Sequence, residues 1–321
     1  LYTNTTGSYN VALGMESLTS NTTADANTAV GYHAGYSNTT GSPVTAMGYY
    51  TLDQNTTGVH NNAYGYRAMR FNTTGGYNTA LGGDALYSNT TANANTAVGY
   101  QSLNDNTTGA ANTALGYFAL TNNTTAQKNV AVGVETLENN TTGNFNTGLG
   151  TQALRSNTTA SNNTAVGYQA SYSNTTGTGN TSLGYVSLFG NTTGNYNTVS
   201  GWGGLSSNTT GSNNSAFGYQ ALTANTTASH NTTVGYQAGK NTTTGTGNLL
   251  LGSAAGLTNT TGYQNVYLGQ NTGYSSTGYD NTFVGGGAGY SSTGAGNTFL
   301  GRTAGQNMIS GSKNTILGRF N

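Results

Sequence analysis

The sequence predicts an all-β parallel β-solenoid, or β-roll, built from 17-residue coils. The triplet Asn-Thr-Thr recurs every 17 residues from Asn4 to Asn225, and a glycine recurs at the same interval from Gly14 to Gly269. The glycine series continues at Gly285, Gly301 and Gly318, in steps of 16, 16 and 17, and so marks about 19 coils in 321 residues. A 17-residue period is too short for a pair of helices, which needs more than about 30 residues, and it fits one turn of a solenoid.

The composition excludes several classes of function. Charged residues make up 5% of the chain and the net charge is zero, whereas an ordinary domain is about 25% charged. There is no basic face for nucleic acid and no apolar run of the ~20 residues that a membrane span needs. Cysteine is absent. We therefore expect no nucleic-acid partner, no membrane insertion and no cofactor.

We expect one continuous solenoid over residues 1–321, with regular Asn-Thr-Thr coils in 1–238 and variant glycine-rich coils in 239–321. The triplet slips by one residue at Asn241 and returns to its register at Asn259. The first and last residues both fall inside a repeat. The chain is therefore expected to be a segment of a longer fibre protein.

Each coil is numbered from the first Asn of the triplet, and the consensus is N-T-T-G/A-x-x-N-T-A-V/L-G-Y-Q-A-L-x-S. Positions 7 to 15 are typical of a strand, and the N-T-T-G segment of a turn or second short strand. Position 10 is apolar in nearly every coil and position 15 is mostly Leu. Because residues two apart share one face of a strand, positions 8 and 10 are predicted to face the coil interior, with position 15 as the second wall.

A compensating change occurs in the variant coils. Position 15 becomes Gly239, Gly256, Gly273, Gly289 and Gly305. Over the same stretch position 9 changes from Ala to Leu250, Tyr267, Phe283, Phe299 and Ile316. Volume lost at one position is gained at the other, so the two positions are predicted to line a common space.

Aromatic residues at position 12 form a repeated column. About two large apolar side chains per coil give a thin core, because ordering each residue costs on the order of 1–2 kcal/mol. Packing against other chains would add buried surface, so these rings are candidates for an interface or for stacking on sugars. They are Tyr32, Tyr49, Tyr66, Tyr100, Tyr117, Tyr168, Tyr185, Trp202, Tyr219 and Tyr236.

The Asn-Thr-Thr triplets have two interpretations. Each is an N-glycosylation sequon, whereas stacked Asn side chains can also form a hydrogen-bonded ladder from coil to coil. Position 7 is also Asn in 18 of 19 coils, usually as Asn-Thr-Ala, which is no sequon, so the ladder is favoured. The candidate glycosylation sites are Asn4, Asn21, Asn38, Asn55, Asn72, Asn89, Asn106, Asn123, Asn140, Asn157, Asn174, Asn191, Asn208, Asn225, Asn241 and Asn259.

The residues that could carry catalysis or bind a metal are scattered. His60 and His230 share position 6 but lie ten coils apart, and the carboxylates occur singly. Glu135 and Glu138 are close in sequence and are predicted to be two solvated charges. No pattern for an enzyme or a metal site emerges, so we expect a protein without catalysis.

Segments such as Asn95–Ser102 and Asn163–Ala170 resemble the head repeats of YadA-like trimeric adhesins, and more closely the N-T-A-x-G-Y-Q-A-L repeats of phage and bacterial tail fibres. The resemblance covers essentially the whole chain. It implies a left-handed roll, three chains around one axis and a role in surface attachment. The 17-residue period departs from the shorter YadA-type coil, and the resemblance supplies no receptor-binding residue.

The sequence therefore predicts a structural or adhesive extracellular fibre segment, either a rigid spacer or a multivalent attachment rod. Its expected partners are copies of itself, as a homotrimer or filament, and cell-surface glycans. A virion tail fibre and a bacterial surface filament both fit. The alternatives are a glycan-coated filament and an ice-binding solenoid. The latter ranks low because adjacent Thr residues point to opposite faces of an extended strand.

Overall fold

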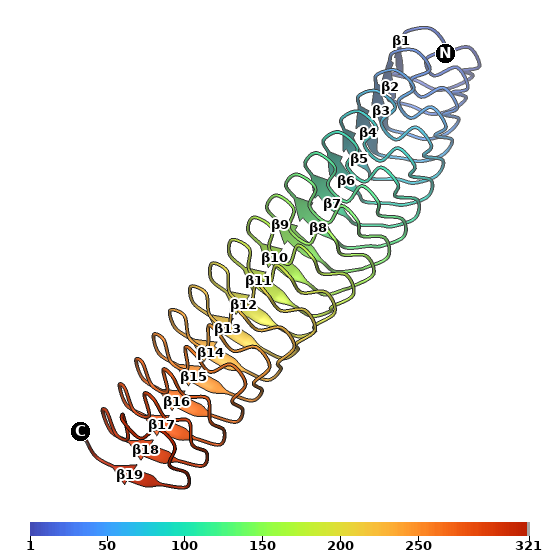
Figure 1. The fold of residues 1–321 in the computed structure, drawn as a ribbon. Coiled ribbons are helices and arrows are strands. Elements are labelled where there is room, and N and C mark those ends of the chain that lie inside the picture. Colours follow the sequence, from blue (N-terminus) through green and yellow to red (C-terminus); the bar gives the residue numbers. More distant parts are fainter. Residues whose placement is uncertain (320–321) are drawn as a thin grey trace. The chain divides into compact units, whose positions relative to one another are not determined.

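The computed structural model describes residues 1–319 and is an all-β parallel β-solenoid (Figure 1). Residues 320 and 321, at the end of the predicted variant segment, lie outside the described residues. The chain divides into two compact units, residues 1–162 and residues 163 onward. No helix of the described residues is long and apolar enough to cross a membrane.

In each unit, successive short strands pair in parallel, and each strand belongs to one coil. The first unit contains β1 (Val11–Leu13), β2 (Thr28–Val30), β3 (Val44–Met47), β4 (Asn61–Tyr64), β5 (Thr79–Leu81), β6 (Thr96–Val98), β7 (Thr113–Leu115), β8 (Val130–Val132) and β9 (Thr147–Leu149). The second unit contains β10 (Thr164–Val166), β11 (Thr181–Leu183), β12 (Thr198–Ser200), β13 (Ser215–Phe217), β14 (Thr232–Val234), β15 (Leu249–Leu251), β16 (Val266–Leu268), β17 (Thr282–Val284), β18 (Thr298–Leu300) and β19 (Thr315–Leu317).

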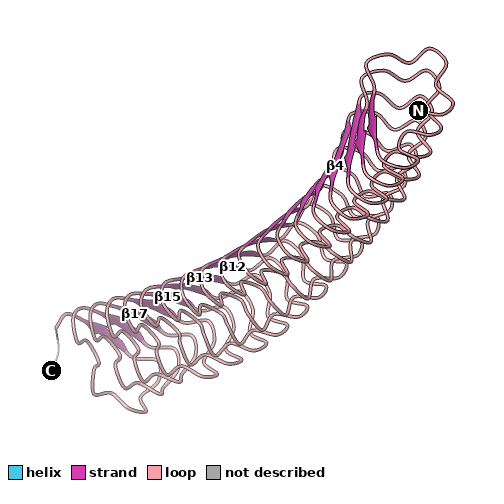
Figure 2. Ribbon diagram, turned by 90° about the horizontal axis from the view of Figure 1, so that it is seen from above, coloured by secondary structure: helices cyan, strands magenta, loops and turns pink. Residues whose placement is uncertain are grey.

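The strands are shorter than the sequence predicts, because nearly all cover only positions 8 to 10. Figure 2 shows them on one side of the coils, with loops forming the rest. The glycine at position 11 ends the strand: Gly116, for example, has a φ of 145°. A Cβ there would lie 2.3 Å from the carbonyl oxygen of Gly133 in the next coil. The N-T-T-G segment is a bend and not a strand.

The prediction that positions 8 and 10 face the interior is wrong. Position 9 points inward, as in Ala97 and Ala114, which are fully buried. Position 10 points outward, and Leu115 is 46% exposed. The physical reason is width: position 9 lies opposite the large residue of position 15, so the coil interior accommodates Ala and not Leu at position 9. The alternation of period two was correct, but its phase was inverted.

Position 15 forms the second wall, as predicted. Leu86, Leu103 and Leu120 are fully buried. Their φ angles are 51°, 51° and 52°, in the left-handed region that costs a non-glycine residue roughly 1–2 kcal/mol. Burial of the Leu side chain offsets that cost, since it contributes roughly 1.5–3 kcal/mol.

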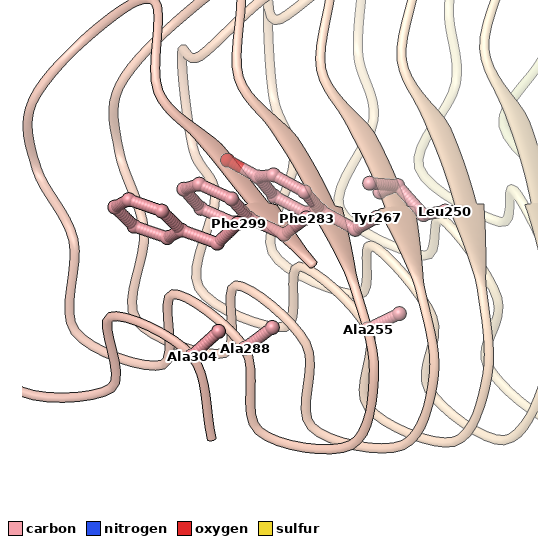
Figure 3. Close-up of a cluster of buried hydrophobic side chains, with 7 residues drawn as sticks. All are labelled: Leu250, Ala255, Tyr267, Phe283, Ala288, Phe299 and Ala304. Atoms are coloured by element: carbon pink, nitrogen blue, oxygen red, sulfur yellow. The ribbon is translucent and has the colours of Figure 1, made fainter. Parts of the chain in front are cut away.

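The compensating change in the variant coils is also confirmed. Leu250, Tyr267, Phe283 and Phe299 lie in a row inside the coils of the second unit (Figure 3). A Cβ added to Gly289 would lie 2.3 Å from the ring of Phe283. The rings therefore occupy the space that position 15 fills elsewhere, and glycine removes the left-handed strain at the same time.

Candidate functional site

The asparagines at position 1 form a buried ladder, as the favoured interpretation predicted. Asn123 is a representative member and is fully buried. Its Nδ2 donates to Oδ1 of Asn106 in the preceding coil at 2.7 Å and to the carbonyl oxygen of Ala126 at 3.0 Å. The same pair of bonds recurs from coil to coil, so each amide satisfies a group that would otherwise be buried without a partner.

The ladder is interrupted in the second unit. Thr242, and not Asn241, occupies position 1 of its coil and is fully buried. The coils keep their 17-residue register there, because Phe217 pairs with Val234 and Val234 with Leu251. The predicted slip at Asn241 is therefore a replacement of Asn by Thr at position 1. Asn225 Oδ1 and Thr242 Oγ1 are left buried without a hydrogen-bond partner.

The asparagines at position 7 form a second column with a different bonding pattern. The backbone N–H of Asn112 donates to Oδ1 of Asn95 at 2.9 Å. Asn112 Nδ2 donates to the carbonyl oxygen of Ala126 in the following coil at 2.8 Å. Asn112 thus bonds to the preceding coil through its backbone N–H and to the following coil through its side chain. Threonine at position 2 adds a third column, in which Thr107 Oγ1 donates to the carbonyl oxygen of Thr124 at 3.1 Å.

The burial of position 1 bears on the glycosylation interpretation. A glycan is attached through Nδ2, the atom that the ladder uses. Fourteen of the sixteen candidate sites have no exposed surface, and only Asn4 and Asn241 are partly exposed. Glycosylation of the buried sites in the folded coil would require the side chain to leave the ladder. The glycan coat stays a prediction, and Asn4 and Asn241 are its most accessible sites.

The ring column at position 12 lies on the surface. Nine of its ten rings are 42–54% exposed. In the second unit, Tyr185 and Trp202 stack with centroids 5.8 Å apart, and Trp202 and Tyr219 with centroids 5.0 Å apart. In the first unit, Tyr100 and Tyr117 stack at 5.8 Å. The faces of stacked rings contact one another, so the column presents mainly ring edges and hydroxyl groups to a ligand.

A charged and aromatic cluster in the first unit was not predicted. His33 Nε2 contacts Oε2 of Glu16, and His33 Nδ1 lies 3.1 Å from Oδ1 of Asp53. The guanidinium of Arg70 lies over the ring of Tyr50, 4.6 Å from its centroid. A hydrogen bond with Tyr32, followed by burial, raises the pKa of Tyr50. Three residues of this cluster, His33, Tyr50 and Asp53, also line a pocket of about 460 Å³. The rest of its lining is Tyr36, Ser37, Gln54, Thr56 and Thr73.

Charged side chains elsewhere in the first unit are also paired. Arg155 Nε lies 2.6 Å from Glu138 and 3.2 Å from Glu135, which corrects the prediction that these carboxylates are two solvated charges. Arg67 and Asp84 form a two-point contact at 2.8 and 2.9 Å, which raises the pKa of Arg67. The sequence did contain a signal for such pairs. Arg67 and Asp84 are 17 residues apart, as are Glu138 and Arg155, so each pair lies on adjacent coils.

Within residues 1–319, no group of three or more histidine or acidic side chains could hold a metal ion. No protein-family model, curated protein or solved structure matches this chain.

Proposed function

We propose that this chain is a segment of a structural or adhesive extracellular fibre, which acts as a rigid spacer with repeated attachment points and without catalysis. Its partners are copies of itself, as a homotrimer or filament, and cell-surface glycans. The observation that carries the proposal is the position 12 column, where half-exposed rings occupy equivalent places on successive coils. Contacts that are individually weak can add up to useful avidity when they recur at a fixed spacing.

The scaffold supports the same proposal. Three polar columns tie successive regular coils together, and the small core of positions 9 and 15 is largely buried. Most polar side chains of the interior are therefore occupied in holding the coils together. This arrangement suits a spacer, because stability depends on contacts between neighbouring coils and any number of coils can be added.

A glycan array probed with the fluorescently labelled chain tests the adhesive part. We expect binding to at least one class of surface glycan. Replacing Tyr185, Trp202 and Tyr219 together by Ala should weaken that binding by much more than any single replacement. The matched control replaces exposed Thr176, Thr193 and Thr210 at position 3 and should bind normally. An array on which the wild-type chain binds nothing would leave only the spacer role.

A further inference from the structure

The outward face of the strands is uncharged, and its position 10 row is mostly apolar. At position 10, the exposed fraction is 49% for Leu81 and 46% for Leu115 in the first unit. It is 40% for both Leu183 and Phe217 in the second unit. Positions 8 and 10 contain no Asp, Glu, Lys or Arg in any coil of residues 1–319. An exposed apolar surface without charge is typical of an interaction site, because a partner can cover it without removing any charged group from water.

The size of the residue at position 10 alternates. Large and small side chains succeed each other over eleven coils, as Leu81, Val98, Leu115, Val132, Leu149, Val166, Leu183, Ser200, Phe217, Val234 and Leu251. Within each unit these residues are direct neighbours in the strand register. Since adjacent strands lie about 4.8 Å apart, the large side chains recur about every 10 Å with a gap between them.

A buried position follows the same two-coil period. Position 4 is Ala in the coils that carry Val98, Val132, Val166 and Val234, and Gly in those that carry Leu115 and Leu149; the coil that carries Ser200 departs from this pattern, with Gly at position 4. The chemical repeat is therefore 34 residues, or two coils, although the fold repeats every 17. On the strand face, the large position 10 side chains therefore project in a row, and the small ones leave gaps between them.

We propose that this strand face is a seam against a second copy of the chain set one coil out of step, so that each large residue of one copy lies over a small residue of the other. This inference rests on the proposed fibre function and names its self-contact. A matching row with the same spacing is present on another copy of this chain. Packing in step would place large residues against large ones and leave voids at the levels of the small ones, and both faults are destabilising.

Disulfide cross-linking tests the offset, because the chain contains no cysteine. A Leu115→Cys variant is mixed under mild oxidation with Val98→Cys or Val132→Cys, and separately with Leu81→Cys or Leu149→Cys. A disulfide requires Cα atoms within about 7 Å, so the offset is read directly. We expect at least five-fold more linked dimer with a small-position partner than with any large-position partner or with Leu115→Cys itself. Equal or greater linking between large positions would overturn the offset.

Two controls separate the seam from other effects. Thr108→Cys, at the exposed position 3, should not link. Leu115→Glu combined with Leu149→Glu should abolish association in analytical ultracentrifugation without changing the circular dichroism spectrum, because position 10 lies outside the coil. A wild-type chain that stays monomeric and unlinked would overturn the seam, and the alternation would then record only duplication of a 34-residue unit. Glycan binding by such a monomer would support the adhesive function without the seam. Cross-linking without glycan binding would support the seam without the adhesive function.

Discussion

Repairing the interrupted asparagine ladder should stabilise the second unit. In Thr242→Asn, the new Nδ2 can donate to Asn225 Oδ1, which now has no partner. The new Oδ1 can accept from Asn259 Nδ2, as the equivalent atoms do in the intact ladder. Asn259 Nδ2 currently donates to the carbonyl oxygen of Gly262 at 3.2 Å. The substitution thus completes two bonds in a site whose shape already accepts Asn in the neighbouring coils.

The magnitude follows from those two bonds. A typical buried hydrogen bond contributes about 1 kcal/mol net, so the substitution should stabilise the local structure by about 2 kcal/mol. That free energy corresponds to a roughly 30-fold change in a local opening equilibrium. Solenoids unfold from coil to coil, so a local measurement is more informative than one global transition. Amide hydrogen exchange of residues 242 and 259 should slow by about 30-fold.

Two matched variants make the test sharp. Asn123→Thr creates the same defect in the intact ladder of the first unit and should speed exchange there by a similar factor. Asn241→Thr alters the Asn that lies outside the ladder and should have almost no effect. If Thr242→Asn and Asn123→Thr were both without effect, the ladder would contribute nothing measurable and the reasoning would be refuted.

Three further predictions concern glycine, the core and pH. Gly116→Ala should lower the free energy of unfolding in denaturant by ~2 kcal/mol or more, because φ is 145° and the added Cβ would lie 2.3 Å from a neighbouring backbone oxygen. Gly203→Ala is the matched control: its added Cβ would lie 3.8 Å from the nearest atom, and the loss should be about 1 kcal/mol. Phe283→Ala should lower the free energy of unfolding by about 3–5 kcal/mol, and Gly289→Leu should also destabilise the protein. The double variant should recover part of the loss, because the new Leu can fill the space that the ring leaves. Strictly additive effects in this double-mutant cycle would show that residues 283 and 289 do not share a space. Burial raises the pKa of Tyr267, so the stability that this residue contributes should be intact below the unfolded-state pKa of about 10 and be lost as pH rises above it. When unfolding is measured at a series of alkaline pH values, the free energy of unfolding should decline less steeply with pH in Tyr267→Phe than in the wild type. Identical slopes for the two proteins would contradict this.

The period of the sequence predicted the solenoid because every coil must place equivalent groups at equivalent heights. It did not settle which strand face points inward. An alternation of period two is satisfied equally well with positions 8 and 10 inside the coil or with position 9 inside. The larger residues at position 10 suggested the wrong face. The decisive signal was the exchange of volume between positions 9 and 15, since only residues inside the same coil can compensate each other.

The candidate sites were predictable to different degrees. The asparagine ladders followed from the repeated Asn at position 7, which in most coils has no sequon to explain it. The replacement at Thr242 was obscured because Asn241 happens to precede two threonines and preserves the triplet. The cluster around His33 joins Glu16 and Asp53 from three coils. It was missed because the charged residues were assessed singly and not at a spacing of about one coil.

The central claim is that polar columns inside the coils hold successive coils together, while the apolar residues of position 10 point outward. A cryo-electron microscopy map of the native protein at side-chain resolution tests this claim most directly. The account predicts coils about 4.8 Å apart, position 1 asparagines stacked inside without added density, and position 10 side chains outside the coil against a second chain. Glycan density on the Asn123 column, or Leu115 packed inside the coil, would contradict it.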